Sequence, residues 1–398
     1  MLATSVGGIT LASCVYNASG PKTNSIEALI KIGNTSAGAI LSKSATLNAQ
    51  DGNELPRFIN KIDLGGNYCN GSMNSEGLPN QGIDYYINDN ALLQIKKCNK
   101  PYIVSLSGLT LNDNLEMLDR IFSRPLGNIN GIELNLACPN IVNKPVIAYD
   151  FDQLDEVLNA ISKLIHSIER EIPPLGIKLA PYFDPSHFKK AIEIITKYSV
   201  VKYIVTTNTI GNAMFIDAEM ECAAIAPRNG LGGLGGGYIK HTALANVYML
   251  YKELVSSGRT DIDIVGVGGV HCGLDAFELI LCGARAVQLG TCHWTESGDC
   301  FERVSSELKI IMQSKGYNSI EDFRGKLKPY MKGAKQITKM STYSNSKLKD
   351  KSNNSNTLLF IILPMFLIFV LIIFPYISFS IDFAGLRNHY LLRVVNNN

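Results

Sequence analysis

The sequence lacks the cysteine and histidine patterns of a disulfide scaffold or of a zinc site. Its nine cysteines are an odd number, no two form a Cys-x-x-Cys pair, and no histidine lies at zinc-ligand spacing from them. No acidic cluster and no Ser-His-Asp arrangement stands out either. We therefore predict no metal site and expect reduced thiols in a cytosolic setting.

A targeting leader is also missing from the start of the sequence. Residues 1–20 carry no basic residue ahead of their apolar run and no convincing cleavage site. This pattern argues against a secretory or a mitochondrial presequence. We expect the catalytic body to remain in the cytoplasm.

Most of the chain has no excess of positive charge. The formal net charge is +2, but residues 324–351 carry nine Lys and Arg against the single Asp350. Residues 352–398 add Arg387 and Arg393 against Asp382, so residues 1–323 sum to −7. An acidic body argues against nucleic acid as a partner, because phosphate binding needs clustered Lys and Arg.

Apolar sequence is present in sufficient amount for a large buried core, since 46% of the 398 residues are hydrophobic. From Leu11 to about Lys328, short β-branched runs alternate with longer amphipathic stretches, which is typical of repeated βα units. The pattern predicts the α/β class, as a TIM (β/α)8 barrel over residues 1–330, with a doubly wound open sheet as the alternative. The eight strands are expected at Leu11–Asn17, Gly38–Lys43, Tyr102–Ser107, Gly131–Leu136, Leu175–Leu179, Tyr203–Thr207, Ile262–Val267 and Ala286–Leu289.

Helical periodicity fills the intervals between these strands. Asp150 and Asp184-Pro185 are start signals for two of the helices. The expected helices are Ser25–Ile32, Leu115–Phe122, Phe151–Ile168, Ser186–Lys197, Thr242–Val255 and Leu274–Cys282.

The composition changes after the predicted barrel. Residues 331–356 form a basic polar linker, residues 357–381 are almost continuously apolar, and residues 382–398 form a short tail. The apolar segment is uncharged and long enough to cross a bilayer of about 30 Å as a helix. More Lys precede it than Arg follow it, which predicts a tail anchor with the barrel in the cytoplasm. A buried apolar helix and a mis-predicted gene end are the alternatives.

The segment Gly131–Asn140 carries the most chemical information. A predicted strand ends in a turn that brings together the thiol of Cys138 and the amides of Asn135 and Asn140, at the barrel end where such enzymes work. A lone cysteine near a strand end is more often a small buried hydrophobe. Two flanking amides favour another interpretation, in which they hold a planar polar group while the thiol acts as a general base.

Two lysines and two further amides lie at other predicted strand ends. Lys43 and Lys178 are costly to bury unless they meet an anion, so we interpret both as ligand contacts rather than surface charges. Asn74 and Asn208 follow strands as well, although each alone is typical of turn chemistry.

Glycine clusters complete the pattern. Gly268-Gly269 follows the seventh predicted strand and Gly290-Thr291 the eighth, where barrels commonly bind a phosphate through backbone N–H groups. Tight βα turns explain either cluster alone but both together less easily. Residues 230–235 match G-x-G-x-x-G, but no clear strand precedes them, so we give this match little weight.

Taken in order and spacing, these motifs resemble the dihydroorotate dehydrogenases over about residues 5–328. The matching segments are Met73–Asn80, Leu134–Asn140, Gly176–Lys178, Asn208–Asn212, Gly232–Gly236, Gly268-Gly269 and Gly290-Thr291. A cysteine at position 138, rather than serine, resembles the cytosolic class that reduces fumarate. The resemblance implies an FMN-containing barrel, usually a homodimer, that oxidises (S)-dihydroorotate to orotate in pyrimidine synthesis, with fumarate leaving as succinate.

The resemblance also implies roles for individual residues. Cys138 is the base that removes the C5 proton, Lys178 lies beside the flavin, and Lys43 lies between the flavin and the substrate carboxylate. The substrate contacts implied are Lys43, Asn74, Gly77, Leu78, Asn135, Asn140, Asn208 and Thr209. The FMN contacts implied are Ala18, Ser19, Gly20, Lys43, Ser44, Asn135, Lys178, Thr207, Gly236, Gly268, Gly269, Gly290 and Thr291.

Three departures from the family pattern stand out. Ala137 replaces the usual serine before the cysteine, Leu179-Ala180 replaces Met-Pro, and the C-terminal apolar segment has no counterpart in the soluble class. We expect the first change to affect rate and the second to affect packing. The alternatives are a quinone-linked relative, an NAD-linked relative with an iron–sulfur partner, and a membrane-tethered, non-catalytic interaction protein.

Overall fold

Eight parallel strands form the central sheet of the protein, seen here in a computed structural model that describes residues 1–64, 70–125, 127–138 and 146–332. The strands are hydrogen-bonded in the order β3-β16-β15-β10-β9-β8-β7-β4, so that from β4 to β16 each barrel strand pairs with the next one in the chain, and the last, β16, pairs with the first, β3. The barrel strands are β3 (Val15–Asn17), β4 (Ile40–Leu41), β7 (Tyr102–Leu106), β8 (Gly131–Asn135), β9 (Leu175–Lys178), β10 (Val201–Thr206), β15 (Asp263–Val267) and β16 (Ala286–Leu289).

These strands confirm the predicted barrel. Each lies within or overlaps one of the eight predicted ranges, because a strand buried on both faces is an apolar run that stands out in the sequence, as in β7 where all five residues are buried. The first range was predicted too long, since its first residue belongs to a separate hairpin.

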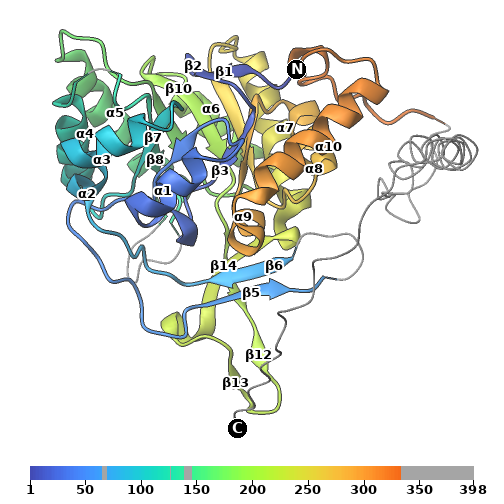
Figure 1. Cartoon of the computed structure of the whole chain (residues 1–398), viewed down its shortest axis with the longest axis horizontal. Helices are drawn as coiled ribbons and strands as arrows, with labels where there is room; N and C mark the ends of the chain where they lie inside the picture. Colours follow the sequence, from blue (N-terminus) through green and yellow to red (C-terminus); the bar gives the residue numbers. More distant parts are fainter. Residues whose placement is uncertain (65–69, 126, 139–145, 333–398) are drawn as a thin grey trace, which may run out of the picture. The chain divides into compact units, whose positions relative to one another are not determined.

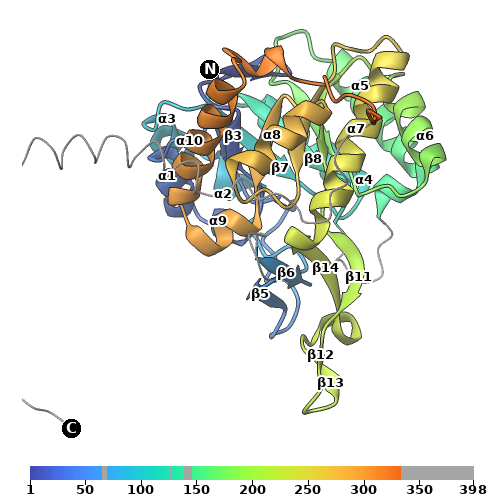
Figure 2. The ribbon, with the colours of Figure 1, turned by 90° about the vertical axis from the view of Figure 1, so that its right-hand side faces the viewer.

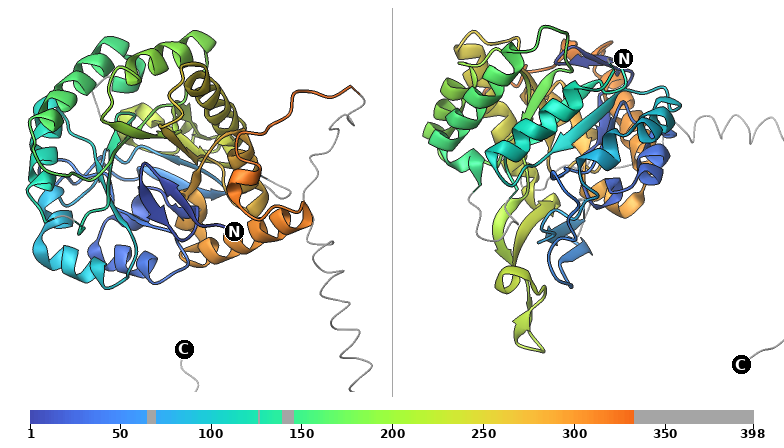
Figure 3. Two further views of the ribbon diagram at one scale, coloured as in Figure 1. Left: turned by 90° about the horizontal axis from the view of Figure 1, so that it is seen from above. Right: turned by 90° about the vertical axis from the view of Figure 1, so that its left-hand side faces the viewer.

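Helices surround the barrel, as the view along it shows (Figure 3, left). They are α1 (Ile26–Gly33), α2 (Ile83–Ile87), α3 (Asp89–Lys96), α4 (Leu111–Phe122), α5 (Phe151–His166), α6 (Pro185–Ile195), α7 (Lys240–Ser256), α8 (Gly273–Cys282), α9 (Thr291–Glu296) and α10 (Asp299–Ser314). Short 3₁₀ turns are η1 (Pro21–Thr23), η2 (Ile147–Tyr149), η3 (Pro227–Gly230), η4 (Gly237–Ile239) and η5 (Ile320–Asp322). All six predicted helices are present.

Local side-chain chemistry explains where two of these helices begin. Asp150 caps α5 by accepting a hydrogen bond from the backbone N–H of Gln153 at 3.1 Å. Asp184 caps α6, and Pro185 occupies its first position, where a missing N–H costs nothing. Both start signals identified in the sequence are therefore confirmed.

The two edges of the barrel sheet, β3 and β4, are joined largely by one side chain. The backbone N–H of Gly38 donates to the carbonyl of Val15 at 2.8 Å, near the start of this seam. Further along, Asn17 Nδ2 donates to the carbonyl of Leu41 at 2.7 Å, and Asn17 Oδ1 accepts from the N–H of Leu41 at 3.0 Å. The carboxamide of Asn17 thus replaces a rung of backbone pairing and closes the barrel.

Smaller sheets lie at opposite ends of the barrel (Figures 1 and 2). At one end, β1 (Thr4–Val6) and β2 (Ile9–Leu11) form a hairpin. At the other end, β5 (Phe58–Ile62), β6 (Gly71–Asn74), β11 (Ile210–Met214) and β14 (Leu231–Gly236) form an antiparallel sheet in the order β11-β14-β6-β5. A short hairpin of β12 (Ile216–Asp217) and β13 (Cys222–Ala223) extends beyond it.

The glycine-rich run that matches G-x-G-x-x-G is strand β14. It pairs antiparallel with β6, and a Cβ on Gly232 or Gly235 would lie 2.9 Å from the carbonyl oxygen of Asn74 or the hydroxyl of Ser72. These glycines therefore permit close approach of two strands, and the run is no dinucleotide-binding turn.

The C-terminal segments predicted from the sequence, the tail anchor at residues 357–381 among them, lie outside the described residues. Among the residues that the structure describes, no helix is both long and apolar enough to cross a membrane.

Candidate functional site

A cavity opens at the carboxyl ends of the barrel strands, beneath the antiparallel sheet. The volume of this cavity is about 140 Å³. The predicted residues that line it are Ser19, Gly20, Lys43, Ser44, Asn74, Gly77, Leu78, Asn135, Cys138, Lys178, Asn208, Thr209, Gly290 and Thr291. The sequence motifs thus converge on one cavity at the end of the barrel where they were expected.

Some predicted residues lie elsewhere. Ala18, Thr207, Gly236, Gly268 and Gly269 do not line the cavity, and Asn140 lies outside the described residues. The glycines among them have packing reasons of their own. A Cβ on Gly236 would lie 2.2 Å from the carbonyl oxygen of Asn70, and one on Gly269 2.5 Å from Lys240 Cβ.

Sequence reasoning assigned no role to four residues of the cavity wall: Pro21, Ser72, Glu76 and Trp294. Ser72 Oγ lies 2.8 Å from Thr291 Oγ1, which joins the antiparallel sheet to the start of α9. Glu76 is buried and pairs with Arg57 at 3.8 Å. Trp294 packs edge-on against Phe58 of β5, with ring centroids 5.0 Å apart. Glu76 lies inside the motif Met73–Asn80, so its position near the site could have been predicted from that motif.

A wider hollow lies at the other end of the barrel, around the β1–β2 turn and the residues that precede β7 to β10. None of the predicted site residues lines it. We therefore regard the cavity at the carboxyl ends as the candidate active site.

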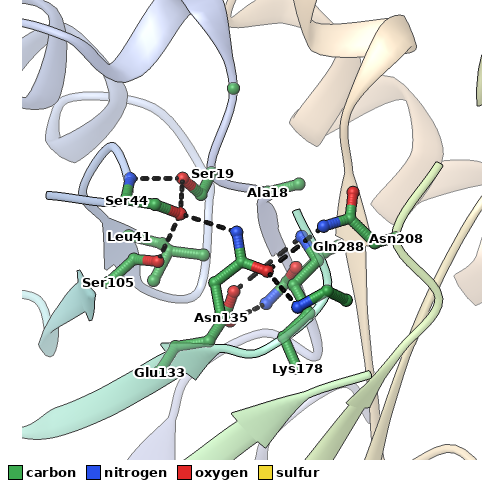
Figure 4. Close-up of polar contacts among 12 residues, drawn as sticks. Ala18, Ser19, Leu41, Ser44, Ser105, Glu133, Asn135, Lys178, Asn208 and Gln288 are labelled. Carbon is green, nitrogen blue, oxygen red and sulfur yellow. Dashed lines mark hydrogen bonds and ion pairs between the residues drawn. The ribbon is translucent and has the colours of Figure 1, made fainter. Parts of the chain in front are cut away.

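Asn135 is the centre of a polar network in this cavity (Figure 4). Its Nδ2 donates to Ser44 Oγ at 3.3 Å, and its Oδ1 accepts from Asn208 Nδ2 at 3.2 Å. Ser44 continues the network, with its Oγ 3.1 Å from Ser19 Oγ and 2.8 Å from Ser105 Oγ. The strand ends of β4, β7 and β8 and the loops after β3 and β10 are thereby held together by hydroxyl and amide groups.

Both predicted lysines are buried at this cavity. Lys43 is 6% exposed, and burial lowers the pKa of its ammonium group, while the nearby Glu76 and Cys138 act in the opposite direction. Lys178 is 5% exposed, and its Nζ lies 3.9 Å from Glu133 Oε1. Two buried cations beside a cavity fit the prediction that an anionic ligand binds there.

Glu133 supports Lys178 from inside the barrel. Its carboxylate accepts a hydrogen bond from Gln288 Nε2 at 2.7 Å, and Gln288 Nε2 also donates to Tyr16 Oη at 3.2 Å. Gly176, opposite Glu133 in the register of β8 and β9, leaves room for the ring of Tyr203, which a Cβ would meet at 2.0 Å. Burial raises the pKa of Glu133, and Lys178 and Gln288 reduce this shift.

This raised pKa predicts a pH-dependent stability. Because folded Glu133 keeps its proton to a higher pH than the unfolded chain, its contribution to stability is full below the unfolded pKa of about 4.5 and is lost as pH rises through the folded pKa. Replacing Glu133 by Gln, which keeps the acceptor for Gln288, should remove this contribution. Denaturant unfolding of both proteins from pH 4.5 upward measures it. Equal slopes of unfolding free energy against pH would show that Glu133 is not perturbed.

The chemistry of the lining residues is compatible with a flavin nucleotide. Gly20 and Gly290 line the cavity, and a Cβ on either would meet nothing closer than 3.8 Å, so their backbone can be approached closely. The hydroxyls of Ser19, Ser44 and Thr291 add donors for phosphate or ring oxygens. The lining therefore supplies hydrogen-bond donors and uncovered backbone of the kind that could hold FMN at the predicted place.

Fold and site together define a TIM-barrel enzyme with a thiol, two buried lysines and several amides at its catalytic end. The comparisons make this specific. The family model for dihydroorotate dehydrogenase matches residues 1–312. The chain is 44% identical to dihydroorotate dehydrogenase (fumarate) of Saccharomyces bayanus over 313 residues, which cover 78% of this chain and 93% of the relative. It is 42% identical to dihydroorotate dehydrogenase A (fumarate) of Lactococcus lactis over 330 residues, covering 82% and 99%.

The chain therefore belongs to the dihydroorotate dehydrogenase family. A solved structure of DHODH from Eimeria tenella in complex with ferulenol superposes with a TM-score of 0.66 at 20% identity, covering 81% of this chain and 88% of that one. At this identity the likeness concerns the fold, and it supports the TIM barrel over the open-sheet alternative.

Proposed function

We propose that this protein oxidises (S)-dihydroorotate to orotate and reduces fumarate to succinate, as a step of pyrimidine synthesis. The observation that carries the proposal is one cavity that joins the Cys138 thiol, the buried ammonium groups of Lys43 and Lys178, and the amides of Asn74, Asn135 and Asn208, in a chain of this family. The relatives named as fumarate enzymes cover nearly the whole barrel at 42–44% identity.

The residues present fit FMN, which when bound would supply hydride transfer between the substrate and fumarate. Ser19, Gly20, Ser44, Gly290 and Thr291 would hold this group, since they line the cavity with hydroxyls and uncovered backbone. Lys178 would stabilise negative charge that develops next to it. Ala18, Thr207, Gly236, Gly268 and Gly269 would act from behind the lining.

In the first half-reaction Cys138 would take the proton from C5 of dihydroorotate, next to a carbonyl group. Asn74, Asn135 and Asn208 would orient the pyrimidine ring by donating and accepting hydrogen bonds, together with Asn140, Thr209 and the Gly77-Leu78 backbone. Lys43 would pair with the substrate carboxylate. In the second half-reaction fumarate would occupy the same cavity, and Cys138 would return a proton as succinate forms. Ping-pong kinetics follow from the shared cavity.

The proposal is tested by the order of colour changes in the purified full-length chain. Under anaerobic conditions, dihydroorotate should bleach the visible absorbance of the bound flavin, and fumarate should restore it. Short-chain quinone, NAD⁺ and succinate serve as comparisons and should leave the protein bleached. Recovery with quinone or NAD⁺ but not with fumarate would assign the chain to another class of the family. A colourless protein without turnover would favour the non-catalytic interaction protein.

Two further proposals concern assembly and location. Exposed apolar side chains on the antiparallel sheet and its extension, namely Phe58, Met214, Ile216 and Met220, support a homodimer that covers them. The uncharged residues 357–381 support a tail anchor that leaves the catalytic domain in the cytoplasm. Sedimentation and detergent-free fractionation of the full-length chain test these proposals separately.

A further inference from the structure

Three side chains that the proposed reaction does not use meet beside α9. His271 lies in the loop after β15, and Cys292 and Glu296 lie one turn apart on α9. His271 Nδ1 is 3.2 Å from Glu296 Oε1, Cys292 Sγ is 3.7 Å from the same oxygen, and all three atoms lie within 4.8 Å of one another. Nitrogen, sulfur and oxygen atoms of these residue types are the protein ligands of zinc.

Two of the three separations fit tetrahedral coordination. With bonds of about 2.05 Å to nitrogen, 2.1 Å to oxygen and 2.3 Å to sulfur, tetrahedral angles place nitrogen and oxygen about 3.4 Å apart and sulfur and oxygen about 3.6 Å apart. The observed 3.2 and 3.7 Å differ little from these distances. A cation could therefore be bound with small side-chain movements.

The histidine nitrogen is available as a ligand. The imidazole of His271 interacts with the other two side chains of the cluster, the Cys292 thiol and Glu296 Oε1, and its Nδ1 is buried. A cation bound at the centre of the cluster would replace these mutual contacts by bonds to the same three side chains.

Arg303 on α10 holds the carboxylate in an orientation that suits a metal. Its Nη2 and Nε donate to Glu296 Oε2 at 2.6 and 3.2 Å, which leaves Oε1 directed to the histidine and the thiol. Arg303 Nη1 also donates to Glu307 at 3.2 Å. Outer contacts of this kind fix ligand geometry in metal sites. The charges of this arrangement balance. The zinc ion (+2) and Arg303 (+1) offset the Cys292 thiolate, Glu296 and Glu307 (−1 each).

The cluster is closed on one side and open on the other. Cys292 is 1% exposed, whereas the side chains of His271 and Glu296 are each 30% exposed. Three protein ligands with an open side leave a place for water as the fourth ligand and a path for the ion to enter.

We propose that His271, Cys292 and Glu296 form a binding site for zinc or a similar divalent cation, with water as the fourth ligand. The thiol proton of Cys292 leaves to solvent when the ion binds. His271 follows Gly268-Gly269 by two residues and Cys292 follows Gly290-Thr291 directly, so the ion would link the loop after β15 to helix α9. The sequence hides this site because His271 and Cys292 are 21 residues apart and only the fold brings them together. The site does not depend on the proposed catalytic function.

The experiment is a metal titration of the purified full-length chain after treatment with a chelator. Cobalt(II) should produce thiolate-to-metal absorption bands that zinc abolishes in competition, and zinc should raise the melting temperature. Cys292→Ser and His271→Gln should each lower the affinity of the site for zinc by at least tenfold. Each variant should therefore bind one equivalent of zinc less than the native chain and lack the cobalt absorption bands. Cys272→Ser is the matched control, because this neighbouring thiol contacts Asp275 instead and should keep full binding.

A native-like circular dichroism spectrum in the presence of chelator shows that a variant is folded. If Cys292→Ser does not fold, His271→Gln still tests the site, because it changes a partly exposed side chain. The proposal is overturned if the native chain shows no thiolate bands with cobalt(II). It is equally overturned if both ligand variants bind as much zinc as the native chain and the Cys272 control.

Discussion

Replacing Cys138 by alanine is expected to lower the turnover number for dihydroorotate oxidation by about 10²–10⁴-fold, the usual contribution of a positioned general base. Cys138 lines the cavity with Lys43 and Asn135, and its charge is close enough to Lys43 to affect the pKa of that lysine. The thiolate is the form of cysteine that accepts a proton. Alanine removes the acceptor and leaves the ring-binding amides in place.

Steady-state kinetics should show the loss in kcat with little change in KM, because substrate contacts remain. Cys138→Ser should be intermediate, since a hydroxyl is a much poorer base near neutral pH. Cys272→Ser, which changes a thiol outside the cavity, is the control and should retain the native rate. Native turnover in Cys138→Ala would remove the thiol from the mechanism.

Replacing Lys43 by methionine is expected to raise KM for dihydroorotate and for fumarate together, each by about 10²-fold or more. A charge pair in a desolvated site contributes on the order of 2–5 kcal/mol, and 1.4 kcal/mol corresponds to a factor of ten. Methionine preserves most of the buried stem of Lys43, so the change concerns the charge rather than the packing.

The parallel effect on both substrates is the informative part. Both molecules are carboxylates and, in the proposed reaction, both occupy the same cavity. Initial rates measured over a grid of the two concentrations give both constants. Lys31→Met, which removes a lysine from the outer helix α1, is the matched control. A rise in KM for one substrate alone would mean that the two bind at different places.

The barrel could be predicted from the sequence because its strands are buried on both faces and its helices carry their own start signals. The sheet β11-β14-β6-β5 could not. Four of the six residues of strand β14 are glycine, and glycine has a low preference for strands. Its structure arises from pairing with β6, more than 150 residues away in sequence, and no local pattern reports such a contact.

The candidate site shows the same division. Asn135, Cys138 and Lys178 stand at strand ends, so the parallel barrel itself brings them together, and the sequence was sufficient to predict them. Trp294 and Ser72 reach the cavity wall through the contact between α9 and the antiparallel sheet, which the sequence does not reveal. Gly236 and Gly269 belong to motifs of the family, but neither lines the cavity. Each packs closely against neighbouring chain, where a Cβ would clash.

The carboxamide of Asn17 makes the barrel wall uneven in strength. Seven pairs of neighbouring barrel strands are joined by backbone hydrogen bonds. The eighth pair, β3 and β4, which lead to Ser19 and Lys43, is joined mainly by the side chain of Asn17. If the ring of strands loosens at any point under heat or denaturant, it should part there first. The side chains proposed to hold FMN and the substrate would then separate before the rest of the domain unfolds, and we expect activity to be lost at a lower temperature or denaturant concentration than secondary structure.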